Sequence, residues 1–204
     1  MSYDASSRAY LTRAKSNFDS GKNEPLFYAA LELRCGVEAR LKEYVKAQGD
    51  TVSFRKIPWK IRKLANTLAK SSVHGRRFVF TFIHPKTRER FPAVYSPVSP
   101  KLQKIAGQLG DYLHCVEQNR VSKPSFFSEF QQLVKQGIGE LESATSGTLI
   151  APPSASGPGR MKFRFEKGRT PSLFDDPEIK NFKFRFQVLR KPTPEHAFFV
   201  LKPI

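Results

Sequence analysis

The sequence predicts an α+β fold: a helical bundle with an inserted basic β-hairpin, followed by a C-terminal Phe-rich antiparallel sheet. Apolar residues recur at helical spacing through much of the first 144 residues, whereas two short runs between 77 and 95 are β-branched and aromatic. Beyond residue 160, Phe alternates with cations. The chain has 204 residues, of which 39% are apolar and eighteen are Phe, so it can bury a core.

Five helices are expected. The clearest begins at Asn23, has Pro25 in its first turn, and carries an apolar stripe that ends before Gly49. Ser99 followed by Pro100 has the form of an N-cap with proline at the first helical position. The expected helices run from Asp4 to about Phe18, from Asn23 to Gln48, after Pro58, from Pro100 to about Val116, and from Ser125 to about Leu141, where Gly137 and Gly139 weaken the end.

The strands are expected to form two separate β regions. The run 77–83, a turn at 84–87 and the run 91–95 read as a hairpin, and Pro92 favours an edge position for the second strand. Strands are also expected at 161–166, 182–188 and 198–202. The predicted division is a helical bundle over 1–144 with the hairpin at about 77–95, a linker over 145–160, and a small antiparallel region over 161–204 that packs on the bundle.

Positive charge is concentrated in the middle of the chain. Residues 51–105 hold thirteen Lys or Arg and one acid, Glu89, so they supply +12 of the net +17. Such a local excess predicts a polyanionic partner, with nucleic acid, RNA or DNA, as the first choice.

The predicted nucleic-acid-binding residues come from the basic segment, the hairpin and the C-terminal strands. Arg and Lys suit phosphate contacts, and Trp59 and Tyr95 are expected to be able to stack on unpaired bases. No base-reading pattern is recognisable, so binding to the backbone without strong sequence specificity is expected. The set comprises Arg55, Lys56, Trp59, Lys60, Arg62, Lys63, Arg76, Arg77, Lys86, Arg88, Arg90, Arg160, Lys162, Arg164, Lys183 and Arg185.

A second hypothesis assigns a catalytic role to His114, Arg34 and Glu38. Arg34 and Glu38 are four residues apart on one expected helix, and His114 borders the apolar stripe of another. If the two helices pack, the three groups form a general acid or base with a phosphate clamp. A structural ion pair and a satisfied histidine explain the same residues without chemistry.

Two segments carry a resemblance to a known family. Residues 26–41, LFYAALELRCGVEARL, and residues 109–114, LGDYLH, resemble helices of small bacterial HEPN-like bundles. The resemblance implies a helical bundle, a homodimer, and in active members metal-independent RNA cleavage by an Arg and a His on one helix. No helix expected here has that Arg and His spacing, so those catalytic residues are not carried over. Inactive members imply a binding module in a defence or toxin–antitoxin system.

Other classes of function lack sequence support. No phosphate-cradling glycine motif, paired C-x-x-C or H-E-x-x-H is present, so no cofactor and no metal is expected. No apolar leader or membrane-length run occurs, and the two cysteines, Cys35 and Cys115, read as reduced thiols of a cytoplasmic protein without a membrane partner. Three functions remain open: nucleic-acid binding, RNA cleavage, and binding of an acidic protein partner.

Overall fold

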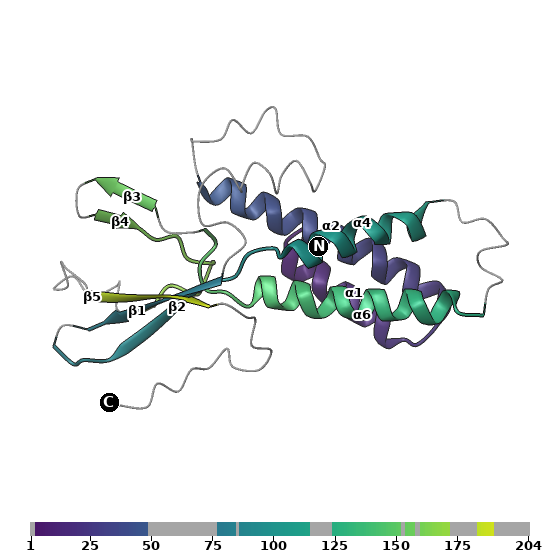
Figure 1. The fold of residues 1–204 in the computed structure, drawn as a ribbon, viewed down its shortest axis with the longest axis horizontal. Coiled ribbons are helices and arrows are strands. Elements are labelled where there is room, and N and C mark those ends of the chain that lie inside the picture. Colours follow the sequence, from purple (N-terminus) through teal and green to yellow (C-terminus); the bar gives the residue numbers. More distant parts are fainter. Residues whose placement is uncertain are drawn as a thin grey trace. The chain divides into compact units, whose positions relative to one another are not determined.

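The structure, a computed structural model, describes residues 3–48, 77–84, 86–114, 124–151, 154–157, 160–171 and 183–189. The chain divides into two compact units. The helical unit comprises Met1–Gly75 and Val98–Thr145, and the sheet unit comprises Arg76–Pro97 and Ser146–Ile204. Figure 1 shows helices in the first and strands in the second, so the predicted α+β class is confirmed.

In the helical unit, α2 packs against each of the other three described helices (Figure 1). Its predicted start at Asn23 is confirmed, and its apolar stripe is buried. The helix expected after Pro58 lies outside the described residues. The described helices are α1 (Ser7–Asp19), α2 (Asn23–Gln48), α4 (Pro100–Leu113) and α6 (Phe126–Thr145).

Local sequence signals set several helix ends. The Ser99 hydroxyl accepts a hydrogen bond from the Leu102 N–H at 3.0 Å, and Pro100 occupies the first turn, which confirms the predicted cap. The expected end of α6 near Leu141 is wrong, because the helix continues past both glycines to Thr145. Gly137 permits close packing instead: a Cβ there would lie 2.5 Å from the Leu33 side chain and 3.0 Å from that of Ile105.

A buried polar network joins three of these helices. Arg40 of α2 is fully buried, and its Nε donates to the Ala144 carbonyl at the end of α6 at 3.2 Å, where Tyr44 Oη donates as well. Arg40 Nη1 lies 3.1 Å from Glu43 Oε2. The Glu43 carboxylate also accepts both the N–H and the hydroxyl of Ser7, each at 2.7 Å, at the start of α1. One arginine therefore connects the C-terminus of α6, where a cation is electrostatically favoured, to the N-terminus of α1.

The sheet unit contains a three-stranded antiparallel sheet in the order β2-β1-β5 and a two-stranded one in the order β3-β4. Pro92 lies in β2, an edge strand, as predicted. The expected strand at 198–202 lies outside the described residues. The strands are β1 (Arg77–Ile83), β2 (Arg90–Tyr95), β3 (Ser154–Gly157), β4 (Arg160–Lys162) and β5 (Lys183–Leu189).

This pairing corrects the predicted division of the chain. The sequence predicts the hairpin as part of the bundle, but β1 pairs along its length with β5, so the hairpin belongs to the sheet unit. The expected linker is also partly structured: the N–H groups of Thr148 and Leu149 both donate to the Val94 carbonyl, and the Val94 N–H donates to Thr148 Oγ1. A central strand exposes two hydrogen-bonding edges: β2, its hairpin neighbour, satisfies one edge of β1, and β5, which is distant in the sequence, satisfies the other.

Candidate nucleic-acid interface

The structure describes only part of the predicted binding set. Arg55, Lys56, Trp59, Lys60, Arg62, Lys63 and Arg76 lie outside the described residues. Strand positions alone are described for Arg160 and Lys162 in β4 and for Lys183 and Arg185 in β5. Side chains are described for Arg77, Lys86, Arg88, Arg90 and Arg164.

The register of the three-stranded sheet brings cationic positions from all three strands to one face. Arg90 lies opposite Ile83, which in turn lies opposite Lys183, and Arg185 lies opposite Thr81 in the adjacent row of that face. Arg77 shares the face at the other end of β1. The β4 residues Arg160 and Lys162 belong to the second sheet, so they are not part of this face.

The opposite face of the sheet is an aromatic core. Phe78, Phe80 and Phe82 are at most 4% exposed, and the ring of Phe163 lies 5.2 Å from that of Phe80 and 4.8 Å from that of Phe82. Tyr95 is fully buried and stacks on Phe78 with ring centroids 5.1 Å apart. The expectation that Tyr95 can stack on bases is therefore wrong, because the odd and even positions of a strand face opposite sides and Tyr95 falls on the inner one.

The hairpin turn presents a run of exposed residues over 86–90. His84 Nδ1 accepts hydrogen bonds from the N–H groups of Lys86 and Thr87 at 3.2 and 3.0 Å, and the Arg88 N–H donates to the His84 carbonyl. Arg88 closes the turn with φ 64°, the left-handed conformation that glycine adopts without strain. The backbone strain of an arginine in this conformation lowers the stability of the folded state by about 1 kcal/mol or more.

Arg77, at the start of β1, is a half-buried cation with no ion pair to a described acid. Burial lowers the pKa of its guanidinium, and its buried Nε has no hydrogen-bond partner in the structure. A half-buried guanidinium favours an anionic ligand, because a bound oxyanion supplies a compensating charge.

The two units differ in how their charges are matched. The described part of the helical unit holds eleven Lys or Arg and ten Asp or Glu, whereas that of the sheet unit holds eleven Lys or Arg and two acids, Glu89 and Glu166. Five cations of the helical unit are paired with carboxylates: Arg13 with Glu32, Lys15 with Glu142, Arg34 with Glu38, Arg40 with Glu43 and Lys101 with Glu140.

The sheet-unit arginines are not matched in this way. Across the described residues, the guanidinium groups of Arg77, Arg88, Arg90 and Arg164 make no ion pair and no hydrogen bond. The donors of Arg88 and Arg90, which are both exposed, are therefore available for a ligand, whereas the Nε of Arg77 is buried. The described part of the sheet unit therefore holds more cations than its described acids can neutralise.

The residues of the catalytic hypothesis lie on packed helices, as it required. Arg34 Nε is 3.8 Å from Glu38 Oε1 on α2, and a Cβ at Gly110 of α4 would lie 2.4 Å from Arg34 Nη1. The Arg34 guanidinium thus lies over Gly110, whose carbonyl accepts the N–H of His114, the exposed cap of α4. These contacts place Arg34 and Glu38 together and leave His114 one helical turn beyond Gly110.

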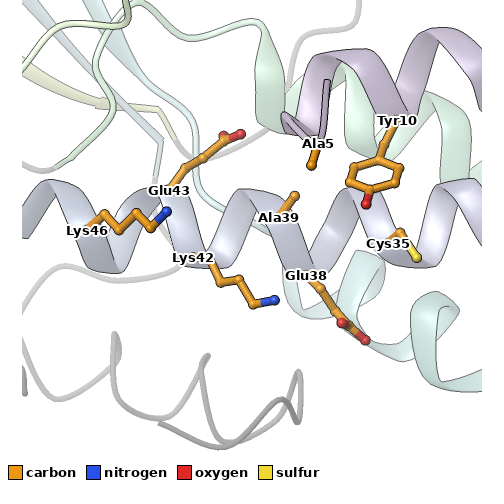
Figure 2. A pocket seen from close by; sticks show the side chains of 8 residues that line it. All are labelled: Ala5, Tyr10, Cys35, Glu38, Ala39, Lys42, Glu43 and Lys46. Carbon is orange, nitrogen blue, oxygen red and sulfur yellow. The ribbon is translucent and has the colours of Figure 1, made fainter. Parts of the chain in front are cut away.

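A pocket of about 290 Å³ lies between the start of the chain and α2 (Figure 2). Its charged lining residues are two glutamates and two lysines, Glu38, Glu43, Lys42 and Lys46. The other lining residues are Ala5, Tyr10, Cys35 and Ala39. Glu43 is already bound to Ser7 and Arg40. Burial, the largest cause, raises the pKa of the Cys35 thiol, which keeps it protonated and unsuited to nucleophilic attack. The balanced charges and small volume argue against this pocket as a reaction centre.

No group of three or more His, Cys, Asp or Glu is arranged to hold a metal ion within the described ranges. The helices of that part of the chain are too short or too polar to cross a membrane. Cys35 is a free thiol, and Cys115 lies outside the described residues.

Comparison with known proteins gives no further guide to this surface. The chain matches no family model, and no curated protein or solved structure matches it.

Proposed function

We propose that the sheet unit binds the phosphate backbone of nucleic acid. The observation that carries the proposal is the set of guanidinium groups that have no partner among the described residues. Three of them are Arg77 of β1, Arg88 of the hairpin turn and Arg90 of β2. Arginine presents a planar fork of donors that suits phosphate oxygens. Within the described residues, the paired cations of the helical unit lack this availability.

The layout of the charge favours a polymeric anion. The cationic positions extend across three strands, Arg90 on β2 and Lys183 and Arg185 on β5, with Arg77 at the far end of β1. Residues 77 and 83 are six positions apart, which at the rise of a strand separates them by about 20 Å. Val79 and Val94 on this face are buried, so the exposed described cations lie at the hairpin end, with Arg88 and Arg90. A nucleic acid backbone releases counterions from each contact that it makes there.

The test is the salt dependence of binding. Full-length protein, freed of bound nucleic acid by nuclease and a high-salt wash, is titrated into a labelled oligonucleotide duplex, and fluorescence anisotropy is followed at several salt concentrations. With about four to six phosphate contacts, log affinity is expected to fall with log salt with a slope of about −4 to −5. A slope near zero contradicts phosphate contacts. If an acidic protein co-purifies in stoichiometric amount in place of nucleic acid, the binding of an acidic protein partner is supported instead.

RNA cleavage is the second candidate, favoured by the position of Arg34 over Gly110, next to the α4 end that carries His114. It extends the resemblance to HEPN-like bundles, with different residues in the catalytic roles. If His114 is the general acid or base, His114→Ala abolishes cleavage of a labelled RNA, because proton transfer contributes about 10²–10⁴-fold, and leaves RNA affinity unchanged. Cleavage that is equal in the two proteins removes His114 from the mechanism.

A further inference from the structure

The three-stranded sheet separates its aromatic positions from its cationic positions completely. One face carries Phe91 and Tyr95 from β2, Phe78, Phe80 and Phe82 from β1, and positions 184 and 186, both Phe, from β5. The other face carries the cationic positions Arg77, Arg90, Lys183 and Arg185. Its remaining positions in these three strands are Val79, Thr81, Ile83, Pro92, Val94, Gln187 and Leu189, none of which is aromatic.

This distribution is the reverse of that found in sheets that bind single strands. Such sheets expose aromatic rings, and successive bases stack on them. Here four rings of the aromatic face are buried in the unit's own core: Phe80 and Phe82 pack against Phe163, and Phe78 stacks on Tyr95. These four rings are therefore unavailable to bases, and the three strands carry no aromatic residue on the cationic face.

We infer that the cationic face selects double-stranded nucleic acid and contacts its backbone alone; this inference rests on the proposed function. A duplex carries one negative charge for about every 1.7 Å of its length and holds its phosphates in a fixed array. A single strand has a lower charge density and loses conformational freedom when it is ordered on a surface. Aromatic stacking offsets that loss in single-strand binders, and this face cannot supply it.

The experiment compares three probes of equal length at one salt concentration. They are a blunt duplex, one of its strands alone, and an abasic strand with the same phosphodiester backbone. The full-length protein is expected to bind the duplex at least about tenfold more tightly than the single strand, and the abasic strand within about twofold of the base-bearing one. In a stacking interface, removal of the bases weakens binding by about tenfold for each base.

The outcomes separate this inference from the proposed function. Equal or tighter binding of the base-bearing single strand, or a large loss with the abasic strand, overturns the duplex preference and leaves backbone binding standing. Absence of binding to all three probes overturns the proposed function itself. A variant with Arg88→Ala and Arg90→Ala locates the site, since undiminished duplex affinity in this variant places the duplex site elsewhere and overturns the inference.

Discussion

Replacement of Arg40 by Met is expected to lower the free energy of unfolding of the helical unit by about 3 kcal/mol. Met keeps the bulk of the side chain but removes the Nε donor to the Ala144 carbonyl and the cation beside Glu43. The Glu43 carboxylate then remains in a partly buried site with only the two Ser7 donors among the hydrogen bonds described here. Urea unfolding followed by far-ultraviolet circular dichroism measures the change, because this signal reports on the helices.

Arg34→Met is the matched control for this change. Arg34 lies on the same helix and is also paired with a glutamate one turn on, but its side chain is 36% exposed and its ion pair is 3.8 Å long. Loss of the Arg34–Glu38 ion pair is expected to lower the free energy of unfolding by less than about 1 kcal/mol, as for other exposed pairs. If Arg40→Met and Arg34→Met have equal effects, the buried network does not organise the junction of α1, α2 and α6.

Simultaneous replacement of Arg88 and Arg90 by Ala is expected to weaken duplex binding by about 10- to 100-fold at moderate salt. Both residues are exposed at the end of the hairpin, and neither guanidinium has a partner in the described structure that it would leave unsatisfied. Each lost phosphate contact is expected to reduce the salt slope by about 1. Fluorescence anisotropy at several salt concentrations measures both quantities.

The matched control removes the same charge from the helical unit. Lys15→Ala with Lys101→Ala deletes two exposed lysines that are already paired, with Glu142 and Glu140 respectively. The net charge falls by the same amount, but affinity and salt slope are expected to change little. Equal losses in the two double variants would mean that binding follows net charge, which contradicts a site on the sheet.

Arg88→Gly separates binding from folding within the same site. Glycine adopts the φ of 64° at this position without strain, so the sheet unit is expected to become more stable by about 1 kcal/mol while binding weakens. A variant that is more stable and binds less tightly assigns Arg88 to the ligand. A variant that is less stable assigns its side chain to the turn.

Local patterns in the sequence predicted most of the described elements. The stripe on α2, the Ser99 and Pro100 cap, the β1–β2 hairpin and the edge position of Pro92 all appear as expected. These features depend on neighbours within a few residues, so the chain specifies them locally. The failures are the end of α6, the role of Tyr95 and the grouping of the hairpin, and each depends on a contact with a distant segment.

Arg40 shows why one buried residue escaped prediction. It reads as one more cation in a charged helix, yet it is three residues from Val37 and four from Tyr44, both on the buried face of α2. This helical spacing is the one feature of the sequence that indicates a buried position for Arg40. The partner that makes burial tolerable, the Ala144 carbonyl, is 104 residues away in sequence, and no local pattern identifies it.

The sequence by itself determined the positions of the described helices and hairpin strands, the excess of positive charge, and the alternation that sends Phe and cations to opposite faces. Tertiary structure alone decided that β5 pairs with β1, and hence that the cationic positions of 90, 183 and 185 lie on one face of one sheet. The physical reason is that a period of two fixes the side of a strand on which a residue lies. It leaves open which strand lies alongside, because either edge accepts any strand that brings matching hydrogen bonds and a matching apolar face.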